Sequence, residues 1–450
     1  MRARASLLVL LFARAVSAQQ TEPSQTVMLE TILHRMDALE QQNKQLAQEV
    51  HDLRQQLTTA HLPESPTQPA APVEERVSVT ENRIEEQAQT KVEASQKLPI
   101  TITGQLLFNA FSNTGNLRVL PDSIYPTFIS TENTTGATVR QSMLGFDFRG
   151  PTVPGDGKIN AHIMLDFYSG IPSEQLDWIR IRTSDISLDW EHRSLTFAYD
   201  KPLIAPRQPN SLAEVAIPPL AGAGNLWLWL PQVRYEERFH LGKSVGIKAQ
   251  AAILQTDETE NYVPTRFTAS LEKSRPAGEG RVAFWKTWND QRRLEIGSGF
   301  HASSSHVAQA SAASRIFSVD WLANPFPRLE ISGTYFHGQN FGGLGALPNG
   351  FTVLYNSTVV PVHGDGGWTQ FSSPLTSRLT LNMFAGFQNN RSADVQPGDV
   401  SQNLSYAGNL MFHLSQNVIL SVEALQMRTQ LRQNGDLIRN RYDLAVAYLF

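Results

Sequence analysis

The carboxy-terminal end of the chain alternates between apolar and polar residues, with the period of two that is typical of a β-strand. The apolar face of this predicted strand consists of five residues that lie two positions apart: Tyr442, Leu444, Val446, Tyr448 and Phe450. Arg441 and Asp443 lie on the opposite face, so one side of the strand can contact lipid and the other water. A chain that ends in this way is typical of an outer-membrane β-barrel, whose last strand must pair with the first.

The last residues also resemble the terminal signal that the bacterial barrel-assembly machinery recognises. The resemblance implies that Tyr448 and Phe450 form an assembly signal, and that this machinery and outer-membrane lipid are partners of the chain. A terminal edge strand of a soluble sandwich is the alternative for this feature.

The same alternation continues through residues 99–450, in short segments that are separated by turn residues. Three of these segments have the apolar residues Ile102, Leu106 and Phe108; Ile159, Ile163 and Phe167; and Leu379, Leu381 and Met383. Roughly 350 residues without a predicted helix exceed one soluble sandwich and suit a wide barrel. We therefore predict an all-β transmembrane barrel of about 16 antiparallel strands, the fold class that fits this length.

A barrel of this width leaves an aqueous lumen, so its contents depend on the residues that face inward. Residues 99–450 contain 22 Arg, 6 Lys and 29 Asp plus Glu, which excludes a simple anion funnel built from net charge. The excess of Arg over Lys is informative because guanidinium groups bind carboxylates in a fixed, bidentate geometry.

Two strands are predicted to direct arginines into the lumen. Arg180 and Arg182 share the face opposite Ile179 and Ile181. In the second strand, the lumenal face is expected to carry Arg234, Glu236 and Arg238. Two interpretations stay open: these residues line a solute path, or they form a salt-bridge lattice that stiffens the wall.

Residues 200–232 form a long connection after the fifth predicted strand, and they are rich in Pro and small residues. A long loop without its own secondary structure is usually functional. It is expected either to fold into the lumen or to lie over the barrel mouth. A second, Gly-rich loop, residues 338–350, is expected to be mobile and extracellular.

The amino-terminal residues 1–18 are a predicted signal peptide, with Arg2 and Arg4, an apolar run at residues 7–12 and a small-residue cleavage site at Ala18. The chain has no Cys, so it has neither a lipid-anchor site nor disulfides. An exported chain of this kind is periplasmic, secreted or a barrel.

Residues 19–60 are predicted to form an α-helical coiled-coil arm in the periplasm. The apolar seam of a parallel homotrimer would consist of the a and d positions Leu29, Ile32, Met36, Leu39, Asn43, Leu46, Val50, Leu53 and Leu57. Asn43 would penalise slipped registers because its amide is satisfied opposite another Asn. One amphipathic helix docked on its own chain is the alternative. Residues 61–98 are a Pro-rich linker and a polar lead-in segment.

The arm, the linker, the long loop and the runs at residues 177–182 and 230–235 together resemble the DcaP-like porins, a branch of the porin superfamily. The resemblance implies a homotrimeric channel of the bacterial outer membrane that passes small anions, dicarboxylates among them. In general porins the loop after the fifth strand narrows the lumen, so Arg207 and Lys201 would carry charge at that constriction. The chain departs from the phosphate-selective porins in its few lysines.

The sequence shows no catalytic or metal-binding constellation and no phosphate-binding glycine motif, so no cofactor and no nucleic acid are expected. Its histidines are scattered, and a barrel hydrolase, the enzymatic alternative, would need His162 together with a lumenal or rim Ser. A structural alternative is that the arm tethers the membrane to peptidoglycan. Tethering and transport are compatible.

Overall fold

The computed structural model describes residues 100–114, 133–169, 178–256, 276–288, 292–307, 310–347, 350–354 and 358–450. The predicted signal peptide, the heptad positions Leu29 to Leu57 and the linker to residue 98 lie outside the described residues. Within the described residues, no helix is long and apolar enough to cross a membrane.

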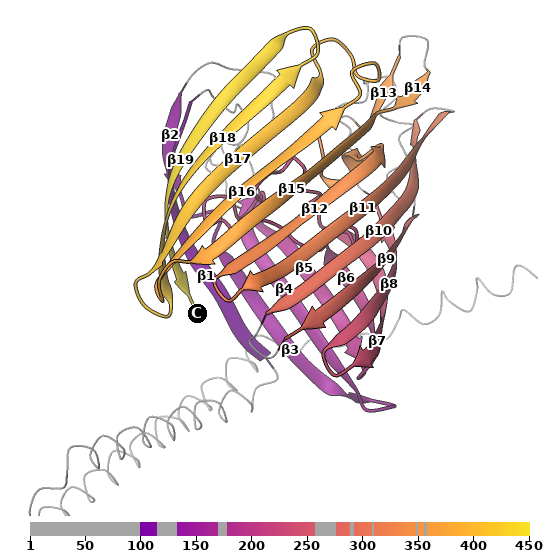
Figure 1. The fold of residues 1–450 in the computed structure, drawn as a ribbon, viewed down its shortest axis with the longest axis vertical. Helices are drawn as coiled ribbons and strands as arrows, with labels where there is room; N and C mark the ends of the chain where they lie inside the picture. Colours follow the sequence, from indigo (N-terminus) through magenta and orange to yellow (C-terminus); the bar gives the residue numbers. More distant parts are fainter. Residues whose placement is uncertain are drawn as a thin grey trace, which may run out of the picture. The chain divides into compact units, whose positions relative to one another are not determined.

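The described residues form an antiparallel sheet whose strands are tilted and wrap around a common axis (Figure 1). The strands of this sheet are β1 (Ile100–Asn113), β2 (Thr134–Thr138), β3 (Met143–Val153), β4 (Gly157–Ser169), β5 (Trp178–Asp189), β6 (Arg193–Asp200), β7 (Leu230–Gly242), β8 (Val245–Gln255), β9 (Pro276–Thr287), β10 (Arg293–Val307), β11 (Ala310–Phe326), β12 (Leu329–Gln339), β15 (His363–Pro374), β16 (Leu379–Asn390), β17 (Val400–His413), β18 (Val418–Leu431) and β19 (Gly435–Leu449). The hairpin β13 (Phe351–Val353) and β14 (Val359–Pro361) and the 3-10 turn η4 (Gly342–Leu344) lie between β12 and β15.

The sheet closes into a barrel because its first and last strands pair. Residues 105–113 of β1 pair antiparallel with residues 441–449 of β19. On its other side, β1 pairs with β3 through residues 100–105 and with β2 through residues 109–113. β2 and β3 therefore share one position, and the 17 strands of the described sheet occupy 16 positions in the wall. The predicted barrel of about 16 antiparallel strands is confirmed.

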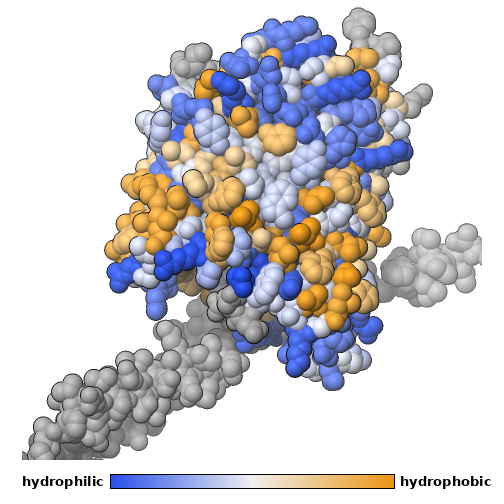
Figure 2. All heavy atoms as spheres, in the orientation of Figure 1, coloured by the Kyte–Doolittle hydropathy of each residue, from blue (hydrophilic) through white to orange (hydrophobic). Residues whose placement is uncertain are grey.

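The outer face of the barrel is apolar, as the period of two predicts. On β1, Leu106 and Phe108 are exposed, whereas Leu107 between them is buried. On β19, Leu444, Val446 and Tyr448 are exposed at every second position. In Figure 2 the apolar side chains form a band across this face, with hydrophilic residues above it and at the lower rim. This is the surface that a lipid-embedded barrel requires.

The two ends of the barrel differ in the length of their connections. At the end that holds the carboxy-terminus, the strands are joined by short turns such as residues 154–156, 243–244 and 327–328. The long connections, residues 201–229 and 340–362 among them, leave the opposite end. In bacterial barrels the short turns are periplasmic and the long loops extracellular.

Candidate functional site

The loop at residues 201–229 lies inside the barrel. It leaves β6, which occupies the fifth position in the wall, and returns through β7. Leu203 N–H donates to Glu279 Oε2 at 2.6 Å, and the carbonyl oxygen of Leu212 accepts from Asn109 Nδ2 at 2.7 Å. Glu279 and Asn109 are lumenal residues of β9 and β1, so the loop crosses the lumen. The alternative of a loop lying over the mouth is wrong.

Apolar packing against the inner wall holds this loop in place. Its buried residues join three clusters with lumenal side chains of the wall: Ile204 and Leu226 with Ile316 and Phe336; Leu220 and Ala223 with Trp368, Phe384 and Met427; and Leu212 and Val215 with Leu107, Ala445 and Ala447. Each large side chain that is removed from water in this way contributes about 1.5–3 kcal/mol. The lumen is therefore partly filled by protein.

Two glycines allow the loop and the wall to approach closely. Gly224 has a φ of 96°, which favours glycine, and a Cβ there would overlap the backbone of Gly367. Opposite, a Cβ on Gly386 would overlap the carbonyl oxygen of Ala223. A side chain at either position would push the loop away from β15 and β16.

Gln141 fixes the middle of the loop from the second wall position. Its Oε1 accepts from the backbone N–H groups of Val215 at 2.7 Å and Ala216 at 3.0 Å, and its Nε2 donates to the carbonyl oxygen of Ala213 at 2.9 Å. Gln141 can do this because β2 and β3 are separated by residues 139–142, where the alternation stops. Residues 140–142 are all buried, which a regular strand does not allow.

The second long loop also packs into the lumen. Phe341 and Leu347 are 2% and 1% exposed, and Asn340 Nδ2 donates to the Oγ of Ser305 at 2.9 Å. Leu344 packs in the same cluster as Ile204 of the first loop. The described part of this loop does not project freely into water, as a mobile loop would, because its apolar side chains are buried against the first loop and the wall.

Arg207 of the first loop forms ion pairs with the wall at β10 and β11. Its guanidinium binds Asp320 of β11 and, through Nη2, Glu295 of β10 at 3.0 Å. Two further cations share these carboxylates. Arg281 binds Asp320 at 2.8 Å and Glu295 at 2.8 Å, and Lys248 Nζ lies 3.5 Å from Glu295. Three cations therefore share two carboxylates where the loop meets the wall.

Cations also outnumber carboxylates where β4 meets β5, because Arg180 and Arg182 of β5 share Asp166 of β4. Both bind Asp166, Arg180 bidentately with contacts of 2.7 and 3.0 Å and Arg182 with one contact of 3.5 Å. Both guanidinium groups also lie over the ring of Trp229, at 5.2 and 4.6 Å from its centroid. Arg180 donates in addition to the carbonyl oxygen of Ala216 at 3.0 Å, so it links the wall to the loop.

The inward residues of β7 are paired with their neighbours. Arg234 binds Asp200 at 3.0 Å and also donates to the carbonyl oxygen of Lys201. Arg238 Nε donates to Glu236 Oε1 at 2.6 Å. Every predicted pore arginine thus has a carboxylate partner, so a solute must compete with that partner for the guanidinium.

Lys201 is the first residue of the loop that follows β6. Burial lowers the pKa of Lys201 to about 8; Asp200 opposes this effect, and Arg182, Arg234 and Arg207 act in the same direction as burial. The charge of Lys201 is therefore lost in mildly basic solution.

The fold is similar to solved structures, although no protein-family model and no curated protein match the sequence. The outer membrane channel DcaP of Acinetobacter baumannii aligns with a TM-score of 0.64 and 15% identity, over 78% of this chain and 97% of that chain. The anion-selective porin from Comamonas acidovorans aligns with a TM-score of 0.51 and 11% identity, over 78% of this chain and 99% of that chain. This chain has a porin fold.

Within the porin fold, the predicted pore residues differ in their access to the lumen. The side chain of Arg238 is 38% exposed and that of Arg180 27%, whereas that of Arg182 is 8% exposed. Arg207, Arg234 and Glu236 are intermediate. Arg182 is thus largely enclosed, and the other five residues reach the lumenal surface.

Charged residues of the lumen that the sequence did not single out include Lys248, Arg281 and Asp320. A signal for Arg281 exists, because Val282 and Phe284 alternate outward on β9 and place it inward. Nothing in the sequence indicates that these residues meet Arg207, because alternation gives the face of a residue and not its distance from a loop.

Proposed function

We propose that this chain is an outer-membrane porin through which small hydrophilic solutes diffuse passively, with a preference for carboxylates and other small anions. The observation that carries the proposal is the charge imbalance between the loop and the wall. Arg207, Arg281 and Lys248 share two carboxylates, and Arg180 and Arg182 share one. Each cluster keeps one positive charge in excess, at a place where the loop narrows the lumen.

Such clusters favour passage over tight capture. A solute carboxylate gains strength from the reduced dielectric of a narrow lumen, but it competes with the resident carboxylates for each guanidinium. Conduction requires binding that is favourable enough for entry and weak enough for exit. Partly paired arginines meet both requirements.

Liposome swelling with the purified full chain tests this proposal. We expect faster entry of a small dicarboxylate than of a neutral sugar of similar size. Equal rates of entry would indicate a porin without selectivity. No swelling with either solute would contradict the proposal that the chain forms a channel.

The same proposal places the chain in the bacterial outer membrane as a homotrimer, inserted by the barrel-assembly machinery, with its coiled-coil arm in the periplasm. Tethering to peptidoglycan through the arm is compatible with transport. A peptidoglycan pull-down with the full chain, compared with a chain lacking residues 19–60, separates the two roles.

We propose a channel that is not an enzyme. His162 binds Asp147 at 2.7 Å, and no hydrogen bond to a Ser is found for it among the described residues. Ser303, His301 and Glu279 do form a hydrogen-bonded chain, with contacts of 3.0 and 2.9 Å. However, His301 and Glu279 are 2% and 3% exposed, and Glu279 also accepts from the loop at Leu203. This chain of residues anchors the loop.

A further inference from the structure

Two aromatic side chains each contact two guanidinium groups on the lumenal side of β4 and β5. The ring centroid of Tyr168 on β4 lies 4.6 Å from the guanidinium carbon of Arg140 and 5.5 Å from that of Arg180. Trp229, the last residue of the loop that follows β6, contacts Arg180 at 5.2 Å and Arg182 at 4.6 Å in the same way. The guanidinium of Arg180 is therefore common to both rings.

These rings stabilise an arrangement that charge alone opposes. Arg180 and Arg182 share the carboxylate of Asp166, so two positive charges lie beside one negative charge. The face of an aromatic ring attracts a guanidinium group within about 6 Å, and more strongly where water is excluded. Tyr168 and Trp229 are 6% and 5% exposed, so little water screens this attraction. The two rings therefore compensate part of the repulsion between the arginines.

The contacts of Arg180 leave one edge of its guanidinium open. Its Nε and Nη2 donate to Asp166 at 3.0 and 2.7 Å, and Nη2 also donates to the carbonyl oxygen of Ala216 at 3.0 Å. Nη1 has no hydrogen-bond partner among the described residues, and it is not enclosed by protein. Nη1 is thus the part of this group that a solute in the lumen can reach. Arg182 differs, because its side chain is 8% exposed and its Nη1 lies 3.5 Å from Asp166.

We propose that Nη1 of Arg180 is a binding position for small carboxylates in the lumen, and that Tyr168 and Trp229 are positioning residues that hold it there. The inference rests on the proposed anion-preferring channel and names the group that a solute contacts in it. The N–H bonds of Nη1 can donate to a solute carboxylate while Asp166 keeps its two contacts, so the two carboxylates share the charge of Arg180. Because the rings restrict the guanidinium in advance, binding requires less ordering of the side chain.

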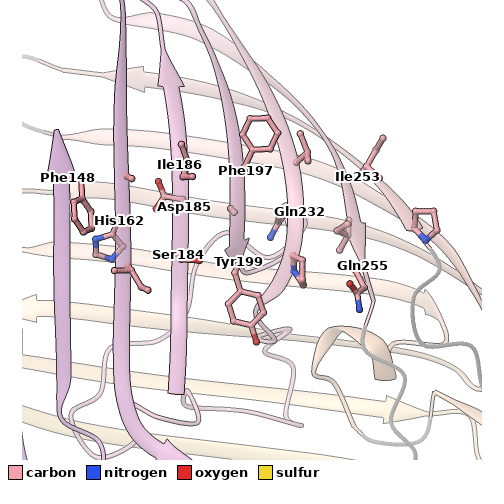
Figure 3. A pocket seen from close by; sticks show the side chains of 17 residues that line it. Phe148, His162, Ser184, Asp185, Ile186, Phe197, Tyr199, Gln232, Ile253 and Gln255 are labelled. Carbon is pink, nitrogen blue, oxygen red and sulfur yellow. The ribbon is translucent and has the colours of Figure 1, made fainter. Parts of the chain in front are cut away.

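Substitution at Trp229 separates positioning from packing. Trp229→Leu keeps an apolar side chain beside Arg180 but removes the face of the ring, whereas Trp229→Phe keeps an aromatic face. The control is Phe197→Leu, because Phe197 is an aromatic residue of β6 that is 47% exposed on the outer wall. It lies with Ile186 and Ile253 in an apolar depression of that wall (Figure 3).

The permeability ratio of acetate to potassium measures the effect in the full chain, from reversal potentials in gradients of potassium acetate. We expect Trp229→Leu to lower this ratio roughly two- to fivefold, the loss that corresponds to one cation–π contact. Trp229→Phe should keep most of the ratio, and Phe197→Leu should leave it unchanged. A wild-type ratio in Trp229→Leu would overturn the proposal. A loss in Trp229→Phe as large as that in Trp229→Leu would assign only a packing role to Trp229, and it would also overturn the proposal.

Arg180→Lys tests the open edge and leaves the rings in place, so it decides the question if Trp229→Leu does not fold. Lysine keeps the positive charge, but its ammonium group lacks the planar fork that can bind Asp166 and a solute at separate edges. We expect the acetate ratio to fall in a barrel that is still heat-modifiable. A wild-type ratio would show that charge alone matters, and it would overturn the proposal.

The wild-type recordings separate this inference from the proposed function. A wild type without anion preference would contradict the proposed selectivity and the binding position together. An anion-selective wild type whose ratio is shared by Trp229→Leu and Arg180→Lys would contradict the binding position alone.

Discussion

Phe450 closes the barrel on Gly104. Gly104 N–H donates to the Phe450 carbonyl oxygen at 2.9 Å, and Phe450 N–H donates to the Gly104 carbonyl oxygen at 3.2 Å. The Phe450 ring lies so close to Gly104 that a Cβ there would overlap it. The terminal aromatic residue and a glycine on the first strand thus form one closing contact.

A side chain at position 104 should impair closure. We expect Gly104→Val to lower the yield of heat-modifiable barrel, because the methyl groups would collide with the Phe450 ring and the backbone of Met143. Gly408→Val is the matched control, since nothing lies closer than 3.7 Å to a Cβ there. Equal yields from both variants, measured by gel mobility with and without heating, would refute the role of this contact.

Removing the terminal ring should have a larger effect. Phe450→Asp places a charge in the apolar band and removes the predicted assembly signal, so we expect unassembled protein in the periplasm. Cell fractionation measures this outcome. A normal barrel yield from Phe450→Asp would count against a lipid-embedded last strand.

The heptad arm should add stability to the oligomer without being needed for the barrel. Deleting residues 19–60 removes a predicted seam in which Leu39, Leu46 and Leu53 each contribute about 1.5–3 kcal/mol. We expect a lower dissociation temperature of the trimer and an intact barrel. An isolated arm peptide that stays monomeric and non-helical at high concentration would show that the arm does not self-associate.

Gln141 should restrict the motion of the loop at residues 201–229. Gln141→Leu leaves the N–H groups of Val215 and Ala216 unpaired in a buried place, at a cost of about 1–3 kcal/mol for each group. We expect a folded barrel with larger fluctuations of its open-channel current. Gln426→Leu, which removes the hydrogen bond that Gln426 Nε2 donates to Asn440 Oδ1 on the wall, is the control and should leave the current steady. Identical recordings from the two variants would mean that apolar packing alone holds the loop.

The alternation of apolar and polar residues in the sequence was sufficient to predict the barrel and the face on which each strand residue lies. The outward apolar residues of β1 and β19, and the inward direction of Arg180 and Arg234, follow from a period of two, because lipid and water impose opposite preferences on adjacent residues. The strand number followed from length. The position of the long loop after the fifth strand, together with the resemblance to porins, suggested an inward path but left a path over the barrel mouth open.

The interruption at residues 139–142 and the burial of the second loop could not be predicted. Both depend on lumenal apolar residues such as Leu107 and Phe336, which pack against loops and not against lipid. An apolar residue on the lumenal face is indistinguishable in sequence from one on a fully buried strand. The ion pairs of Arg207 depend in the same way on where a loop lies in space.

The charge of Lys201 should make selectivity depend on pH. Because burial lowers its pKa to about 8, the folded barrel carries this charge in mildly acidic solution and loses it as the pH rises through that value. We expect anion preference to fall between about pH 7 and pH 9, within the range where a Lys in water would stay charged. Lys201→Met should remove this dependence. A wild-type profile that Lys201→Met shares would assign the titration to another group.

The reversal potential of single channels in asymmetric salt tests the central claim most directly. The account predicts an anion-selective potential for the wild type, and a shift toward cations in Arg207→Ala and in the double variant Arg180→Ala with Arg182→Ala. Arg193→Ala, whose guanidinium lies over the Trp190 ring, should leave the potential unchanged. If both lumenal variants keep the wild-type potential while folding normally, these arginines belong to a salt-bridge lattice in the wall, and the claim that they select solutes is wrong.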